Sequence, residues 1–172
     1  MVHLIIEFLF LSSRLESIGE QLFSWLTKLD TLDVSGNELE TMELECFAGL
    51  HHLEVLRINN NRLSSLDHHA FQLTTSLEIL ELRNNAITFC HPKTFYFQTE
   101  LVNLDLSGNA LQWLPDGLFT VTKSLKYLYL NSNNLTHFGT QLFWPLKKLS
   151  WLQMEGNMVT KIKEVGTSTD FA

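Results

Sequence analysis

The sequence predicts a solenoid of the α/β class, in which short strands form one concave parallel sheet and the convex side is irregular or carries short helices. Three observations predict it. One leucine pattern recurs every 24 residues, an asparagine stands at the same place in nearly every copy, and so does a phenylalanine. Because one copy cannot bury its own leucines, the copies must stack and share a core.

The repeat reads LxxLxLxxNxLxxLxxxxFxxL, and its copies follow one another without a gap. Seven copies in one register predict a single repeat domain over residues 5–162, followed by a C-terminal tail at 163–172. The copies begin at Ile5, Leu29, Leu53, Leu77, Leu101, Leu125 and Leu149.

The first part of each copy predicts a short strand. Its leucines at places 1, 4 and 6 point into the core, whereas residues 3, 5 and 7 point outward on the concave face. Stacked strands of this kind pair in parallel, so the outward residues of neighbouring copies lie beside one another.

The asparagine follows the strand, where the chain turns inward and buried backbone groups need partners. An amide side chain offers two donors and an acceptor, which predicts a structural role. This asparagine ladder comprises Asn37, Asn61, Asn85, Asn109, Asn133 and Asn157, with Ser13 in the first copy. The phenylalanine column is expected to fill the convex side of each coil. It comprises Phe23, Phe47, Phe71, Phe95, Phe119 and Phe143.

These columns, together with the stretch "LVNLDLSGNALQWLPDGLF" at residues 101–119, resemble the leucine-rich repeat family. The resemblance is to its 24-residue extracellular form, found in Toll-like receptor ectodomains, Slit-type guidance proteins and small matrix proteoglycans. It implies a horseshoe-shaped solenoid that recognises a protein or another macromolecule. It also implies an extracellular setting, in innate immune recognition or cell adhesion, although no signal peptide is visible.

The family usually closes its solenoid with cysteine-rich caps, and this sequence shows neither cap. An uncapped solenoid exposes apolar edges, so we expect a fragment of a longer receptor-like chain or a truncated product. Leu9 and Leu11 point outward at the first strand, toward a missing cap or a second copy of the chain. The alternative function is therefore a structural protein that assembles through its uncapped ends.

Charge and hydropathy limit the partners. The 19 acidic and 12 basic residues leave a net charge of -7, which disfavours nucleic acid as a ligand. The outward strand positions carry eight acids against three bases, so a basic patch on a partner would be attracted to them. No apolar run is long enough for a transmembrane span, which takes about 18 residues.

Large aromatic residues gather on the outward positions of the last two copies. Such residues dominate binding hot spots, although aromatic residues also favour strands and pack against each other there. We expect aromatic anchors for a protein or glycoconjugate ligand, with polar neighbours that orient it. The anchors are Tyr127, Tyr129 and Trp151, and the polar neighbours are Asn103, Asp105, Gln153 and Glu155.

Catalytic and cofactor motifs are missing: the sequence has no nucleophile elbow, phosphate-binding loop or HExxH pattern. We therefore expect a protein that is not an enzyme and needs no cofactor. Cys46 and Cys90 lie two copies apart, roughly 10 Å in a stacked sheet, which is too far for a disulfide.

Histidines in two neighbouring copies also invite attention. Stacking could bring His91 alongside Asp67 and near His68 and His69, which would place zinc ligands together. The alternative is that these histidines are merely solvated. Because no recognised ligand spacing is present, we expect no metal site.

One glycosylation sequon is present, Asn134-Leu135-Thr136. It follows the ladder asparagine at a variable position that should be exposed. Asn134 is a candidate glycan site if the chain is exported.

Overall fold

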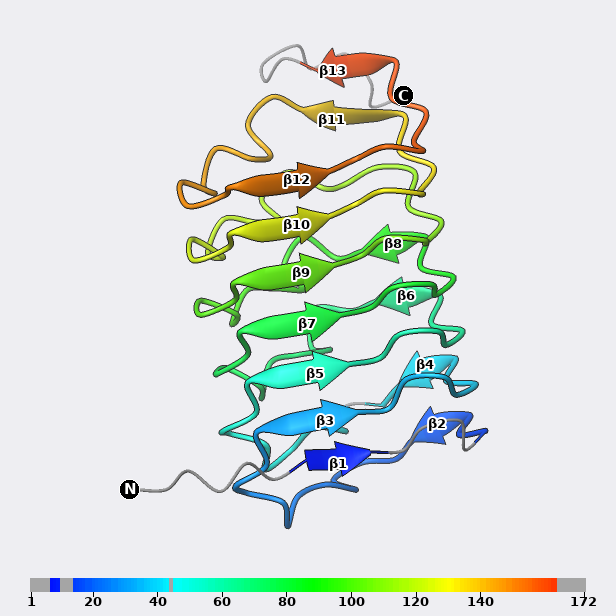
Figure 1. The fold of residues 1–172 in the computed structure, drawn as a ribbon, viewed down its shortest axis with the longest axis vertical. Helices are drawn as coiled ribbons and strands as arrows, with labels where there is room; N and C mark the ends of the chain where they lie inside the picture. Colours follow the sequence, from blue (N-terminus) through cyan, green and yellow to red (C-terminus); the bar gives the residue numbers. More distant parts are fainter. Residues whose placement is uncertain (1–6, 10–13, 44, 164–172) are drawn as a thin grey trace.

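A computed structural model describes residues 7–9, 14–43 and 45–163. It shows the predicted solenoid, with coils stacked along the longest axis of the molecule (Figure 1). No helix occurs within the described ranges, so the convex side there is irregular. Four features of the sequence analysis lie outside the described residues: the start at Ile5, Leu11, Ser13 and the tail beyond Lys163.

The main sheet has seven parallel strands, each three residues long. Each residue pairs with the residue 24 positions further on, as Leu32 does with Leu56 and Leu56 with Leu80. The 24-residue repeat of the sequence therefore sets which residues pair across the sheet. In sheet order the strands are β1 (Glu7–Leu9), β3 (Thr31–Asp33), β5 (Val55–Arg57), β7 (Ile79–Glu81), β9 (Asn103–Asp105), β10 (Tyr127–Tyr129) and β12 (Trp151–Gln153).

Further strands of two or three residues run back in the opposite direction, beside the main sheet (Figure 1). They form three parallel pairs, and an isolated bridge joins Trp113 to His137. The pairs are β2 (Ser17–Ile18) with β4 (Thr41–Met42), β6 (Ser65–Leu66) with β8 (Phe89–Cys90), and β11 (His137–Gly139) with β13 (Lys161–Lys163). These strands bring the variable residues that follow them in neighbouring copies close together.

The turn after each main strand from β3 to β12 has a left-handed residue just before the ladder asparagine. The φ angles there lie between 54° and 70°, a region that glycine and asparagine occupy at low cost. A Cβ atom at Gly108 would also collide with the amide of Asn84. The residues at this place are Gly36, Asn60, Asn84, Gly108, Ser132 and Gly156.

The core runs through the middle of the coils. The strand leucines of the inner copies, such as Leu56, Leu80 and Leu104, are fully buried. Beside them stacks the phenylalanine column, in which neighbouring rings are nearly parallel with centroids 6.1 to 6.5 Å apart. Each inner coil buries the same apolar groups against the next, and this continuous burial stabilises the stack, whereas the last copy leaves Leu152, Val159 and Ile162 exposed.

Both cysteines are free thiols in the core. Cys90 takes a leucine place of the repeat and pairs with Leu66 of β6. Burial raises the pKa of the Cys46 and Cys90 thiols to about 12.

In the described part of the chain, no helix is long and apolar enough to cross a membrane.

Candidate functional site

The concave face consists of the outward-pointing side chains of the main sheet. In β10, Leu128 points inward and is buried, whereas Tyr127 and Tyr129 point outward. The register places Tyr127 between Asn103 of β9 and Trp151 of β12. The structure therefore brings two of the expected anchors, Tyr127 and Trp151, side by side.

These three anchors, named here the aromatic patch (Tyr127, Tyr129 and Trp151), remain accessible. Tyr127 is 41% exposed and Trp151 is 50% exposed. Tyr129 is half-buried. In the adjacent β12, Leu152 is 40% exposed, because this strand lies at the edge of the sheet. The patch thus offers apolar area to a ligand.

Polar residues lie beside the aromatic patch on the same strands and on the neighbouring strand β9. Tyr129 pairs with Asp105 on one side and with Gln153 on the other. Asn103, Asp105 and Gln153 are half-buried, and Glu155 is exposed just beyond β12. Anchors and polar neighbours therefore share three adjacent strands and the turn after them.

Existing hydrogen bonds and burial determine which oxygen atoms of these polar residues are available. Oδ1 of Asp105 already accepts the backbone N–H of Ser107 over 2.8 Å, which leaves Oδ2 as the available oxygen. The Oδ1 atoms of Asn103 and Asn131 are covered and accept no hydrogen bond from a described residue.

Charged residues on β5 and β7 pair with each other. Nε of Arg57 lies 3.5 Å from Oε2 of Glu81, and Asn59 donates to the same oxygen over 2.7 Å. Because Arg57 and Glu81 are partly exposed, the pair contributes little to stability. It does leave the charged groups of this part of the concave face paired with each other.

The asparagine ladder is built into the scaffold. Oδ1 of Asn61 accepts the N–H of Leu39 over 3.1 Å, and its Nδ2 donates to the carbonyl of Val34 over 3.1 Å. Asn85, Asn109, Asn133 and Asn157 repeat the same two bonds to the preceding coil. Oδ1 of Asn37 likewise accepts the N–H of Leu15. These side chains are occupied and do not face a ligand.

Two further predicted positions are exposed. The side chain of Asn134 is exposed next to the buried Asn133, as a glycan acceptor requires. Leu9 is 54% exposed on β1, which is an edge strand of the main sheet.

Away from the concave face, the chain gathers ionisable side chains after β6 and β8. Asp67, His68 and His69, named here the histidine cluster, each offer one possible ligand atom, and these atoms lie within 4.8 Å of one another. The pairing of Leu66 with Cys90 brings His91 alongside, with its ring 4.8 Å from that of His68. The structure thus assembles the residues that the sequence analysis considered as ligands.

The carboxylate of Asp67 organises this cluster. Its Oδ1 accepts the backbone N–H of His69 over 3.0 Å and lies 2.9 Å from Nδ1 of His68. The pKa of Asp67 is lowered, chiefly by the hydrogen bond from His69 and further by the nearby imidazoles. The carboxylate is therefore charged at neutral pH.

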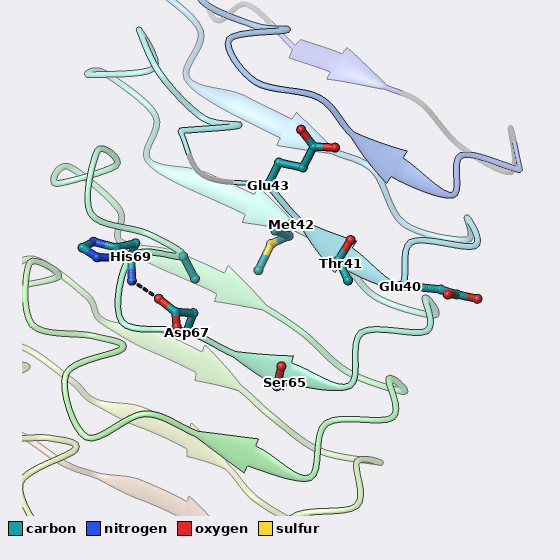
Figure 2. A pocket seen from close by; sticks show the side chains of 8 residues that line it. Glu40, Thr41, Met42, Glu43, Ser65, Asp67 and His69 are labelled. Atoms are coloured by element: carbon teal, nitrogen blue, oxygen red, sulfur yellow. Dashed lines mark hydrogen bonds between the residues drawn. The ribbon is translucent and has the colours of Figure 1, made fainter.

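Two shallow hollows flank the histidine cluster. One of about 250 Å³ is lined by residues of the β4 and β6 segments, with Asp67 and His69 on one side and Glu43 across from them (Figure 2). The other, of about 280 Å³, is lined by His68, His69, Gln72, Lys93, Tyr96 and Phe97. The cluster is thus reachable from two sides.

Sequence reasoning missed exposed aromatic residues elsewhere. Trp25 is 69% exposed, Trp144 is 61% exposed and Tyr96 is 53% exposed. Phe89 and Trp113 also contact each other, with ring centroids 6.1 Å apart. All stand at places where the repeat specifies no residue type. The only sign of them in the sequence was that an aromatic residue occupies a variable place. Exposed aromatic area is therefore not confined to the concave face.

Comparisons with known proteins place this geometry in context. The family model described as leucine rich repeat matches residues 11–63, 51–111 and 99–159. A search of curated proteins found no match. Among solved structures, 295 chains match, so the solenoid by itself does not single out one ligand.

One of these structures is the crystal structure of the LRIM1/APL1C complex. It superposes with a TM-score of 0.75 at 26% sequence identity and covers 83% of this chain. The present chain spans 26% of the length of that one. The neighbour is thus a larger protein of the same fold, solved in a complex of proteins.

Proposed function

The chain belongs to the leucine-rich repeat family, and we propose that it is a recognition module that holds a protein or glycoconjugate on the concave face. The family is typically a binding scaffold and not an enzyme fold. The observation that carries the proposal is the pairing of Tyr127 with Trp151, two accessible aromatic residues on adjacent strands. Tyrosine and tryptophan bury large area with few rotatable bonds, which suits them as anchors.

The polar neighbours supply orientation. Asp105 keeps one free carboxylate oxygen, and the half-buried Asn103 adds an amide beside Tyr127. Gln153 and Glu155 add an amide and a carboxylate on the far side of Tyr129. Such groups around an aromatic centre form the polar rim of an interface.

The partner should carry a basic patch that meets this surface. Acidic residues outnumber basic ones on the outward strand positions, and Arg57 is already engaged by Glu81. The remaining negative charge would speed the encounter with a basic partner and make it sensitive to salt.

Matched tryptophan variants test the assignment. Secreted proteins and glycans are screened against the purified chain by biolayer interferometry, and each ligand found is titrated against Trp151→Ala and Trp144→Ala. Trp151 is on the concave face, whereas Trp144 is more exposed but lies elsewhere. Truncation of a hot-spot side chain raises Kd by about 30-fold. We expect this increase for Trp151→Ala and no change for Trp144→Ala. A ligand lost with Trp144→Ala and retained with Trp151→Ala would place binding on another face.

The setting we propose is extracellular, in innate immune recognition or cell adhesion. The resemblance to receptor ectodomains supports it, and so does the exposure of Asn134 in its sequon. Expression behind a secretion signal, with glycosidase treatment, tests the glycan. We expect a mass decrease on treatment and none for Thr136→Ala, which removes the sequon. An exported chain of unchanged mass would contradict the glycan site.

A second candidate function is self-association through the N-terminal edge. It is favoured by the 54% exposure of Leu9 on the edge strand β1. Light scattering over a concentration series tests it. Mass that rises with concentration and returns to the monomer in Leu9→Asp would support assembly. A monomer at every concentration, unchanged in Leu9→Asp, would exclude it.

A further inference from the structure

The sequence led us to expect no metal site, but the convergence of three side chains changes that expectation: we propose that Asp67, His68 and His69 form a binding site for one zinc ion. The site lies on the flank of the solenoid, apart from the concave face and independent of the proposed recognition function. Two imidazoles and a carboxylate are a common set of zinc ligands, and a water molecule completes the tetrahedron.

The backbone places the three residues together for reasons of local structure. They follow β6 directly, and the N–H of His91 donates to the carbonyl of Leu66 over 3.0 Å, which holds this segment against the next coil. The bond from the His69 N–H to Asp67 folds the segment back on itself, so that residues adjacent in sequence present their side chains to one point. Ligand atoms of all three lie within 4.8 Å of one another.

The hydrogen bond of His69 leaves its Nε2 atom available to a metal ion. Nδ1 of His69 lies 2.8 Å from Oε1 of Gln72. Because an amide oxygen only accepts, Nδ1 carries the proton and Nε2 keeps its lone pair. A hydrogen bond of this kind, from the second imidazole nitrogen to an oxygen, orients histidine ligands in metal sites.

Asp67 and His68 offer the other two ligands. Nδ1 of His68 lies 2.9 Å from Oδ1 of Asp67, a hydrogen-bond distance at which the imidazole N–H donates to the carboxylate. Two ligands of a tetrahedral zinc ion lie about 3.4 Å apart, given bond lengths of about 2.1 Å. An ion that replaces the proton of this hydrogen bond can therefore bind both atoms with a small adjustment. Asp67 and His69 are exposed and His68 is half-buried. Their side chains therefore have room to rotate until all three ligand atoms reach one ion.

The surroundings favour a cation. The hollow beside Asp67 and His69 is lined by Glu40 and Glu43 in addition, and none of the described residues that line it is lysine or arginine. Lys93 lies on the other hollow. Its backbone N–H donates to Nδ1 of His91 over 3.1 Å, which occupies the lone pair of that nitrogen. His91 is not among the residues whose ligand atoms lie within 4.8 Å of one another, so we infer that it is a neighbour of the site and not a ligand.

The chain contains its own control for this proposal. His51 and His52 form a second exposed histidine pair, and Nδ1 of His52 is bonded to the carbonyl of Thr27 over 2.9 Å. Within the described part of the chain, only the histidine cluster unites three potential ligand residues. A double substitution at residues 51 and 52 thus removes the same chemical groups without touching the site.

Calorimetric titration of the chain with zinc chloride, in a buffer that does not bind metals, tests the proposal. We expect one ion per chain, affinity lost in the double variant H68A/H69A, and affinity retained in H51A/H52A and in His91→Ala. Asp67→Asn should weaken binding by about tenfold or more, since it removes both a ligand and the group that orients His68. Circular dichroism of every variant without zinc establishes that each is folded.

Three outcomes would overturn the proposal. They are no binding by the unchanged chain, equal loss of affinity in H51A/H52A and H68A/H69A, and binding of inorganic phosphate in place of zinc. The last would mean that the imidazoles and Lys93 act as cations toward an anion. Thermal melting with and without zinc provides a second readout, because an ion that binds the native state raises Tm of the unchanged chain but not of H68A/H69A.

Discussion

Oδ1 of Asn109 accepts a hydrogen bond from the backbone N–H of Ile87, 22 residues earlier in the chain, over 3.1 Å. Nδ2 of the same side chain donates to the carbonyls of Leu82 and Leu106, each over 3.0 Å. One buried amide thus joins two neighbouring coils at the point where the main strands end. The stack depends on such bonds because these backbone groups have lost access to water.

Asn109→Ala should lower the free energy of unfolding by about 1 to 3 kcal/mol, since it leaves buried backbone groups without partners. Chemical denaturation measures the change. The control is Asn134→Ala, at an exposed asparagine, which should change stability by less than about 0.5 kcal/mol. Equal losses in the two variants would contradict the structural role of the ladder.

Phe95 stacks between Phe71 and Phe119, at centroid distances of 6.1 and 6.5 Å, and is fully buried. Phe95→Ala should destabilise the protein by about 3 to 5 kcal/mol, through lost burial and the cavity that remains. Phe97 is 42% exposed and meets Tyr96 edge to face, so Phe97→Ala should cost only about 1 kcal/mol. Thermal melting compares the pair, and a smaller loss for Phe95→Ala would contradict the core assignment.

Tyr129→Ala should leave folding nearly intact, because the side chain points outward on β10. The expected change in unfolding free energy is below about 1 kcal/mol, the size of a cross-strand contact. Binding of any ligand of the concave face should weaken. A loss of Tm equal to that of Asn109→Ala would show that the inward and outward assignments are wrong.

The thiols of Cys46 and Cys90 should not react with thiol reagents at pH 8 in the folded protein, and both should react after unfolding. Burial raises the pKa of each from 9.0 to about 12, and the thiolate is the reactive form. Ellman's reagent in buffer and in denaturant measures the difference. Rapid labelling of the folded chain would contradict their burial.

The same thiols predict a pH dependence of stability. Between pH 9 and pH 12 the unfolded chain loses thiol protons that the native chain retains, so stability falls as pH rises. The slope from each thiol is about 1.4 kcal/mol per pH unit. The double variant C46A/C90A should lose this part of the slope, which denaturation at several pH values measures against the unchanged chain.

The architecture of this protein was determined by its sequence. The 24-residue period corresponds directly to the sheet register, and the leucine and phenylalanine places of the inner copies coincide with the buried core. The pattern is readable because every coil meets the same environment, so the same residue type recurs wherever a group is buried. The outward direction of Tyr127 and Tyr129 follows from the same register.

The tertiary structure alone decided what happens at the variable places. It showed that Oδ1 of Asp105 accepts a hydrogen bond from the backbone N–H of Ser107, and that exposed tryptophans occur away from the concave face. It also brought Asp67, His68 and His69 within coordinating reach. These relationships depend on rotamers and on contacts with the next coil, where the repeat imposes no residue type. Periodicity therefore determines the scaffold, while the chemistry of its surface depends on which side chains meet across the coils.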